Sequence, residues 1–134
     1  MNHAFMPELN LKILRDALAS ESEIVFAYLF GSYLTREQTA LSDIDVAVYP
    51  ARKLTLDERL GVIQRLGKKT AYENLDITFL DRIDNLDLLR TITTRGLVLA
   101  DKNIDARELF EVRVQHEYFD FREQRKRICG EAEM

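Results

Sequence analysis

The sequence predicts an α/β (α+β) protein with a small mixed β-sheet and helices packed against one face. Short runs rich in β-branched and aromatic residues, at 24–30, 44–49 and 75–80, indicate three strands. Longer segments between and after them, such as 56–69, repeat apolar residues at helical spacing. These two periodicities are the basis of the predicted fold class.

The first half of the chain contains two predicted helices and two predicted strands. A helix is expected over 7–19, with Pro7 suited to its first turn. The strand at 24–30 ends at Gly31, and a short helix follows over 33–38. The second strand runs over 44–49 and ends at Pro50.

The second half continues with an amphipathic helix over 56–69, whose early acidic and late basic residues match the helix dipole. A third strand over 75–80 carries Asp76. A helix over 85–94, a short edge strand over 97–100 and a long helix over 105–127 complete the chain. The long helix has more apolar residues than one narrow stripe needs; packing as core is the favoured interpretation, and contact with a partner is the alternative.

Length and composition predict one domain spanning residues 1–134. The chain has 134 residues, of which 46% are hydrophobic and 31% charged, as in ordinary globular proteins. No apolar stretch is long enough to cross a membrane, and the N-terminus does not resemble a secretion signal. A lone cysteine, Cys129, fits the reducing cytoplasm, where we expect the protein to be. Nineteen basic and twenty-three acidic residues give a formal net charge of −4, so direct nucleic-acid binding is not expected.

Three carboxylates are the first candidates for a functional site. Asp43 and Asp45 flank Ile44 at the start of the second strand, and residues two apart in a strand point to the same face. Asp76 reaches the same point if the third strand lies beside the second. Converging carboxylates repel unless a cation joins them, and such oxygen ligands suit Mg²⁺ bound together with substrate phosphates. The group therefore predicts a metal site that also takes a nucleotide.

Gly31 and Ser32 are candidates for binding the phosphates of that nucleotide. They follow the first strand where a helical segment begins, and glycine allows the backbone to approach a ligand closely. Two metal ions about 4 Å apart would activate an attacking hydroxyl and stabilise the leaving pyrophosphate. Asp76 would then orient or deprotonate the attacking hydroxyl.

Each of these features also has an ordinary structural explanation. Gly-Ser after a strand is often only a turn, Asp-x-Asp often caps a loop, and a lone strand Asp often faces solvent. Near the C-terminus, His116 and Tyr118 are interpreted as ordinary helix residues, and a basic cluster at 122–127 as a solvated helix end or, less favoured, a contact surface. Lys68, Lys69 and Tyr72 remain open as nucleotide or acceptor contacts.

Taken together, the motifs resemble the minimal nucleotidyltransferase family of the polymerase-beta-like superfamily. The resemblance rests on Gly31-Ser32, ten intervening residues, Asp43-Ile44-Asp45, and Asp76 within Leu-Asp-Ile-Thr-Phe. It implies the nucleotidyltransferase fold, with Gly31 and Ser32 holding the triphosphate and the three aspartates binding metal and performing catalysis. One departure is visible: family members often have Arg-Gly after the Gly-Ser turn, whereas Arg36 is followed by Glu37.

Stand-alone members of this family that have this size resemble MntA-type antitoxins, which pair with HEPN-domain ribonuclease toxins. This resemblance implies a Mg²⁺-dependent enzyme that transfers AMP from ATP to a tyrosine of the toxin and neutralises it, and it implies a hetero-oligomer. Two alternatives stay open. One is a small-molecule nucleotidyltransferase, although such enzymes usually add a second domain for the acceptor. The other is an antitoxin that acts by contact alone, a role that would not require Asp76.

Overall fold

A computed structural model describes residues 9–35 and 43–133 of the chain. The first half contains α1 (Leu11–Ala19), β1 (Ile24–Phe30), α2 (Ser32–Thr35), β2 (Ile44–Pro50) and α3 (Leu56–Thr70). The second half contains β3 (Leu75–Phe79), the 3-10 turn η2 (Leu80–Arg82), α4 (Leu86–Arg95), β4 (Leu97–Asp101) and α5 (Ile104–Glu133). None of these helices combines the length and apolar character needed to cross a membrane.

The four strands form one mixed sheet in the order β3-β2-β1-β4. β1 pairs antiparallel with β2 and with β4, whereas β2 and β3 are parallel and are connected by α3. The end of β1 therefore lies beside the start of β2, which in turn lies beside the start of β3. At this end of the sheet, Phe30 pairs with Asp45, and Asp45 pairs with Asp76.

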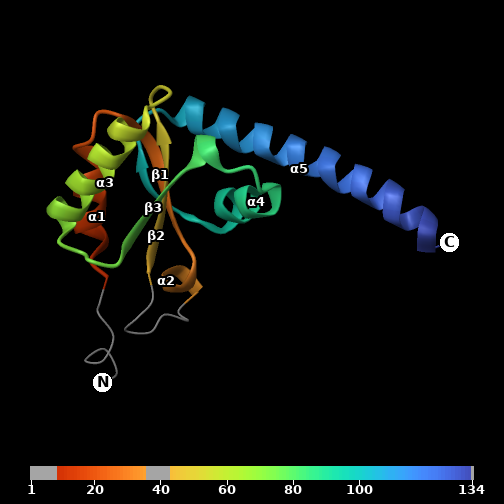
Figure 1. Cartoon of the computed structure of the whole chain (residues 1–134), viewed down its shortest axis with the longest axis horizontal. Helices are drawn as coiled ribbons and strands as arrows, with labels where there is room; N and C mark the ends of the chain where they lie inside the picture. Colours follow the sequence, from red (N-terminus) through yellow and green to blue (C-terminus); the bar gives the residue numbers. More distant parts are fainter. Residues whose placement is uncertain (1–8, 36–42, 134) are drawn as a thin grey trace, which may run out of the picture.

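The predicted mixed sheet is confirmed, but helices cover both of its faces instead of one (Figure 1). Ala27 and Leu29 of β1 belong to a buried cluster with residues of α1 and α3. Phe26 and Tyr28, which alternate with them, belong to a second cluster with residues of α4 and α5. A strand without polar positions must be buried on both sides, and the uninterrupted apolar run at 24–30 is such a strand.

The long helix α5 is anchored at its start and extends past the sheet and α4 (Figure 1). Phe110 packs on Phe26 with ring centroids 5.6 Å apart, and Tyr28 donates a 2.6 Å hydrogen bond to Glu111. Leu109 and Phe119, in contrast, are 63% and 60% exposed. The interpretation as core therefore holds for one side of the helix. Another side presents apolar residues to solvent, and its contact with a partner stays a prediction.

The predicted element boundaries agree with the structure within a few residues for most elements. The largest difference is in α5, which continues to Glu133 instead of ending at Arg127. The first helix begins at Leu11, with Asn10 accepting hydrogen bonds from the backbone of its first turn. Pro7 and the second half of the helix predicted over 33–38 lie outside the described residues.

Candidate active site

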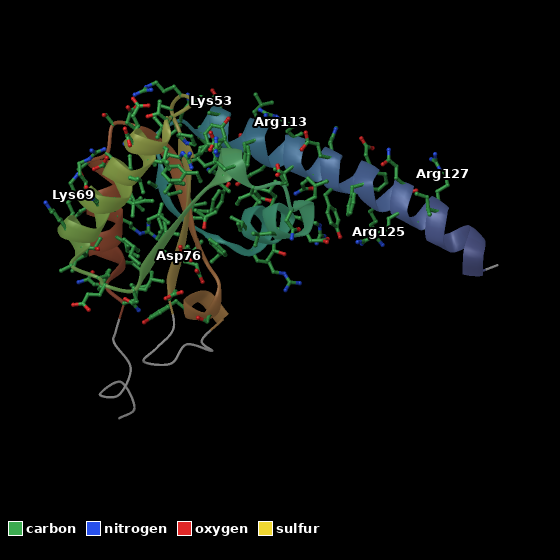
Figure 2. All side chains as sticks on the ribbon, viewed as in Figure 1. Lys53, Lys69, Asp76, Arg113, Arg125 and Arg127 are labelled. Carbon is green, nitrogen blue, oxygen red and sulfur yellow. The ribbon has the colours of Figure 1, made fainter. Side chains whose placement is uncertain are left out.

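Asp45 and Asp76 lie side by side at one end of the sheet. They are register partners on the parallel strands β2 and β3, so their side chains leave neighbouring strands at the same level of the sheet. Ile44, just before Asp45, donates a 2.8 Å backbone hydrogen bond to the carbonyl of Asn74, which aligns the starts of the two strands. Figure 2 shows Asp76 at this end of the sheet. The predicted proximity of these two carboxylates is confirmed.

The surroundings of Asp45 favour the protonated form of its carboxyl group. Partial burial raises the pKa of Asp45 to about 6, and the nearby charges of Asp76 and Asp43 add to the effect. A carboxyl group held among other carboxylates is stabilised by a proton or by a cation. The site therefore has the electrostatics of a cation-binding position.

Asp43 occupies the position directly before β2. Its side chain is exposed, whereas Ile44 is only 2% exposed and packs in the core. The alternation expected from the sequence is thus present, with Ile44 turned inward between the two aspartates.

Gly31 directly faces the Asp45 carboxylate. Its φ angle is +83°, a left-handed conformation that side chains rarely adopt. A Cβ atom at this position would collide with Asp45 Oδ2 and would lie 3.1 Å from Asp45 Cγ. Glycine is therefore required both by the backbone conformation and by the close approach of the carboxylate.

Ser32 begins the single helical turn α2 and is half-buried. This turn follows β1 directly, so Ser32 lies next to Gly31 at the same end of the sheet. Arg36 and Glu37, where the sequence departs from the family pattern, lie outside the described residues.

The three aspartates are the candidate ligands for a metal ion. In residues 9–35 and 43–133, no three or more His, Cys, Asp or Glu side chains form a group arranged to hold a metal ion. Mg²⁺, however, usually takes only one or two protein carboxylates and completes its shell with phosphates and water. The adjacent Asp45 and Asp76, with Asp43 nearby, fit that requirement.

Lys69 and Tyr72, which the sequence left open as ligand contacts, have structural partners. Lys69 donates to Glu21 Oε2 at 2.7 Å, and Arg65 binds the same carboxylate, which is only 3% exposed. Burial alone would raise the pKa of Glu21, but these two cations hold it below its usual value. The Tyr72 hydroxyl accepts a 3.0 Å hydrogen bond from the backbone of Asn10. Lys68 is exposed.

The residues of α5 singled out in the sequence lie away from the aspartates. Arg90 of α4 covers the Tyr118 ring at 4.7 Å, and His116 is exposed. In the basic cluster, Arg125 lies over the Phe121 ring at 5.0 Å and 3.9 Å from Asp87, and Figure 2 shows Arg125 and Arg127 on the projecting part of the helix. These positions agree with the interpretation as helix-surface residues.

The contact between Gly31 and Asp45 was not foreseen from the sequence. The motif alone explains Gly31 by its approach to a ligand, whereas the structure shows that it also makes room for a carboxylate on the neighbouring strand. The residue after β1 lies near the start of β2 because the two strands are antiparallel neighbours, a pairing that was not predicted from the sequence.

Comparisons with known proteins show the family to which the chain is similar. The sequence model of the family described as "Polymerase beta, Nucleotidyltransferase" matches residues 12–105. No curated protein sequence gives a significant match.

Several solved structures with similar folds are toxin–antitoxin complexes. One, a toxin–antitoxin with AMP-PNP, is 28% identical with a TM-score of 0.72 and covers 94% of this chain and 100% of its own. Another, MntA-HepT, is 26% identical with a TM-score of 0.61 over 92% and 93% of the two chains. A third contains a tri-AMPylated Shewanella oneidensis HEPN toxin in complex with MNT antitoxin, at 27% identity, a TM-score of 0.61 and 92% of each chain. The family match spans more than half of the sequence, and the chain therefore belongs to the polymerase beta nucleotidyltransferase family.

Proposed function

We propose that this chain is an antitoxin that transfers AMP from ATP to a tyrosine hydroxyl of a cognate HEPN ribonuclease toxin and thereby neutralises it. The observation that carries the proposal is the pairing of Asp45 with Asp76, with Gly31 packed directly against Asp45. Carboxylates beside a glycine turn suit a metal ion, an acceptor hydroxyl and phosphates, and this supports the proposal.

Each residue has a distinct role in the proposed reaction. Gly31 and Ser32 bind the triphosphate, and Asp43, Asp45 and Asp76 are the metal ligands. Bound Mg²⁺, in one or two ions, would neutralise charge on the phosphates and on the leaving pyrophosphate. Asp76 orients the tyrosine hydroxyl and takes its proton while the oxygen bonds to the α-phosphorus and pyrophosphate departs.

The similar structures support this substrate and this partner. One of them contains AMP-PNP, an ATP analogue, and another contains an AMPylated HEPN toxin bound to its antitoxin. Family membership supplies the reaction class, and these complexes supply the donor and acceptor for the proposal.

Incubation of the chain with labelled ATP, Mg²⁺ and its HEPN-domain partner should attach AMP to a toxin tyrosine. Mass spectrometry of the partner locates the added mass, and a ribonuclease assay measures the loss of toxin activity. Removal of divalent ions with EDTA should reduce transfer to background, and added Mg²⁺ should restore it. Transfer that proceeds unchanged in EDTA would contradict the metal assignment.

Gly31→Ala should weaken binding of a non-hydrolysable ATP analogue about tenfold, because left-handed backbone costs about 1–2 kcal/mol for a residue with a Cβ. The added methyl group also collides with the Asp45 carboxylate, so relief of the clash displaces the turn. Ser32→Ala removes one hydroxyl and should weaken binding less, about threefold. Calorimetric titration of each variant compares them; equal affinities of wild type and Gly31→Ala would refute the phosphate-binding assignment.

A further inference from the structure

β3 is an edge strand of the sheet. In the part of the chain that the structure describes, its only strand partner is β2, so its other edge pairs with no strand. Such an edge presents backbone N–H and C=O groups that can bind an extended segment of another protein.

An apolar hollow of about 260 Å³ lies between β3 and α3. Ile77, Thr78 and Phe79 line it from the strand, and Leu56 and Leu60 line it from the helix. Leu56 and Leu60 are 60% and 47% exposed. Grouped, exposed apolar side chains of this size mark surfaces that contact other molecules.

Arg59 favours a ligand that brings a hydrogen-bond acceptor to the hollow. It lies between Leu56 and Leu60 on α3 and lines the same hollow. Its Nε atom is buried and has no hydrogen-bond partner in the described residues. An unsatisfied buried donor is costly, and a carboxylate is the strongest acceptor for a guanidinium group. Arg82, which also lines the hollow, adds a second positive charge.

The hollow lies along the strand that carries Asp76, which directly precedes Ile77 on β3. An extended segment rises about 3.3 Å per residue. Because side chains alternate between the two faces of a sheet, a segment with one side chain beside Phe79 would bring a residue three positions away, about 10 Å along the strand, next to Asp76.

We propose that the edge of β3 and this hollow dock an extended segment of the protein that receives AMP. The segment would pair with the β3 backbone, insert an apolar side chain between Leu56 and Leu60, and place a carboxylate on Arg59. This inference rests on the proposed function for the identity of the acceptor. It assigns to the hollow the task of aligning the acceptor tyrosine with Asp76.

The double substitution Leu56→Glu and Leu60→Glu tests the proposal. Both residues are exposed on a helix that accepts glutamate well, so the fold should be retained, as circular dichroism and thermal unfolding would verify. Two carboxylates in the hollow should weaken affinity for the HEPN-domain partner about tenfold or more. The KM for the partner should rise with little change in kcat, and ATP-analogue affinity should be unchanged.

The matched control is Leu109→Glu with Val112→Glu, which adds the same charges to exposed apolar positions of α5, 63% and 52% exposed. Partner affinity is measured with the ATP analogue present, so it does not depend on catalysis. If the wild type transfers no AMP but the Leu56→Glu and Leu60→Glu variant still binds the partner more weakly than the wild type does, the proposed reaction is wrong and the docking site stands. Unchanged affinity of that variant, or an equal loss in the α5 control, would overturn the docking site.

Discussion

Replacement of both Asp43 and Asp45 by asparagine should abolish AMP transfer while leaving the protein folded. The neutral amides preserve side-chain size but remove the charges that bind a cation. Because these side chains occupy the end of the sheet rather than its core, the substitution leaves packing largely unchanged. An AMP-transfer assay with the partner measures the loss, and the wild-type rate in the double variant would eliminate the metal mechanism.

The same variant should be more stable than the wild type, in a manner that depends on pH. Asp45 has a pKa near 6 in the fold and about 3.9 in an unfolded chain, so the folded state favours the protonated group. Ionisation of Asp45 therefore costs stability as pH rises from about 4 to 6. The gain in the variant should reach about 1–2 kcal/mol above pH 6 and disappear below about pH 4, allowing for solvent screening. Denaturant unfolding at several pH values measures it.

Asp76→Asn should reduce AMP transfer by about 10²–10⁴, the usual effect of losing a general base. Asp76 is exposed on an edge strand, so this change should spare the fold, and partner binding should persist. Because Asp43 and Asp45 remain, the variant should keep most of its metal and nucleotide affinity. Transfer rates, nucleotide titration and partner pull-down separate these effects.

This variant also distinguishes an enzyme from an inhibitor that acts by contact. If transfer neutralises the toxin, cells expressing toxin and Asp76→Asn should fail to grow even though the two proteins associate. Full growth rescue by a variant that binds the toxin but transfers no AMP would establish inhibition by contact instead. Asp81→Asn, outside the site on η2, is a matched control that should rescue growth normally.

The fold class was predictable because periodicity and breakers both appear in the sequence. The apolar run at 24–30, followed by Gly31, predicts β1 and its end, and the structure confirms both. The alternation in Asp43-Ile44-Asp45 similarly predicts that Ile44 points into the core and that the two aspartates point away from it. The proximity of Asp45 and Asp76 followed from placing two strands together, whereas their catalytic roles remain a proposal.

Other features depend on tertiary contacts that no local pattern encodes. The assignment of helices to one face was wrong because helical periodicity shows that a helix has an apolar side but not which face of the sheet it covers. Lys69 resembled a ligand contact, yet its charge is matched by Glu21, 48 positions earlier. The hollow beside β3 could not be predicted without knowing that β3 is an edge strand, and this depends on the order of the strands in the sheet.

Because α5 extends past the sheet, the stability of its helical structure differs along its length. Around Phe110 and Val114, which are 6% and 2% exposed, opening the helix also disrupts the core. Further along, Ile128 is 74% exposed, and helical hydrogen bonds there have little tertiary packing to reinforce them. The free energy of local opening therefore decreases along the helix, and amide hydrogen exchange becomes faster. The distal half of α5 is consequently a segment whose order a bound molecule can change greatly at little cost to the rest of the fold.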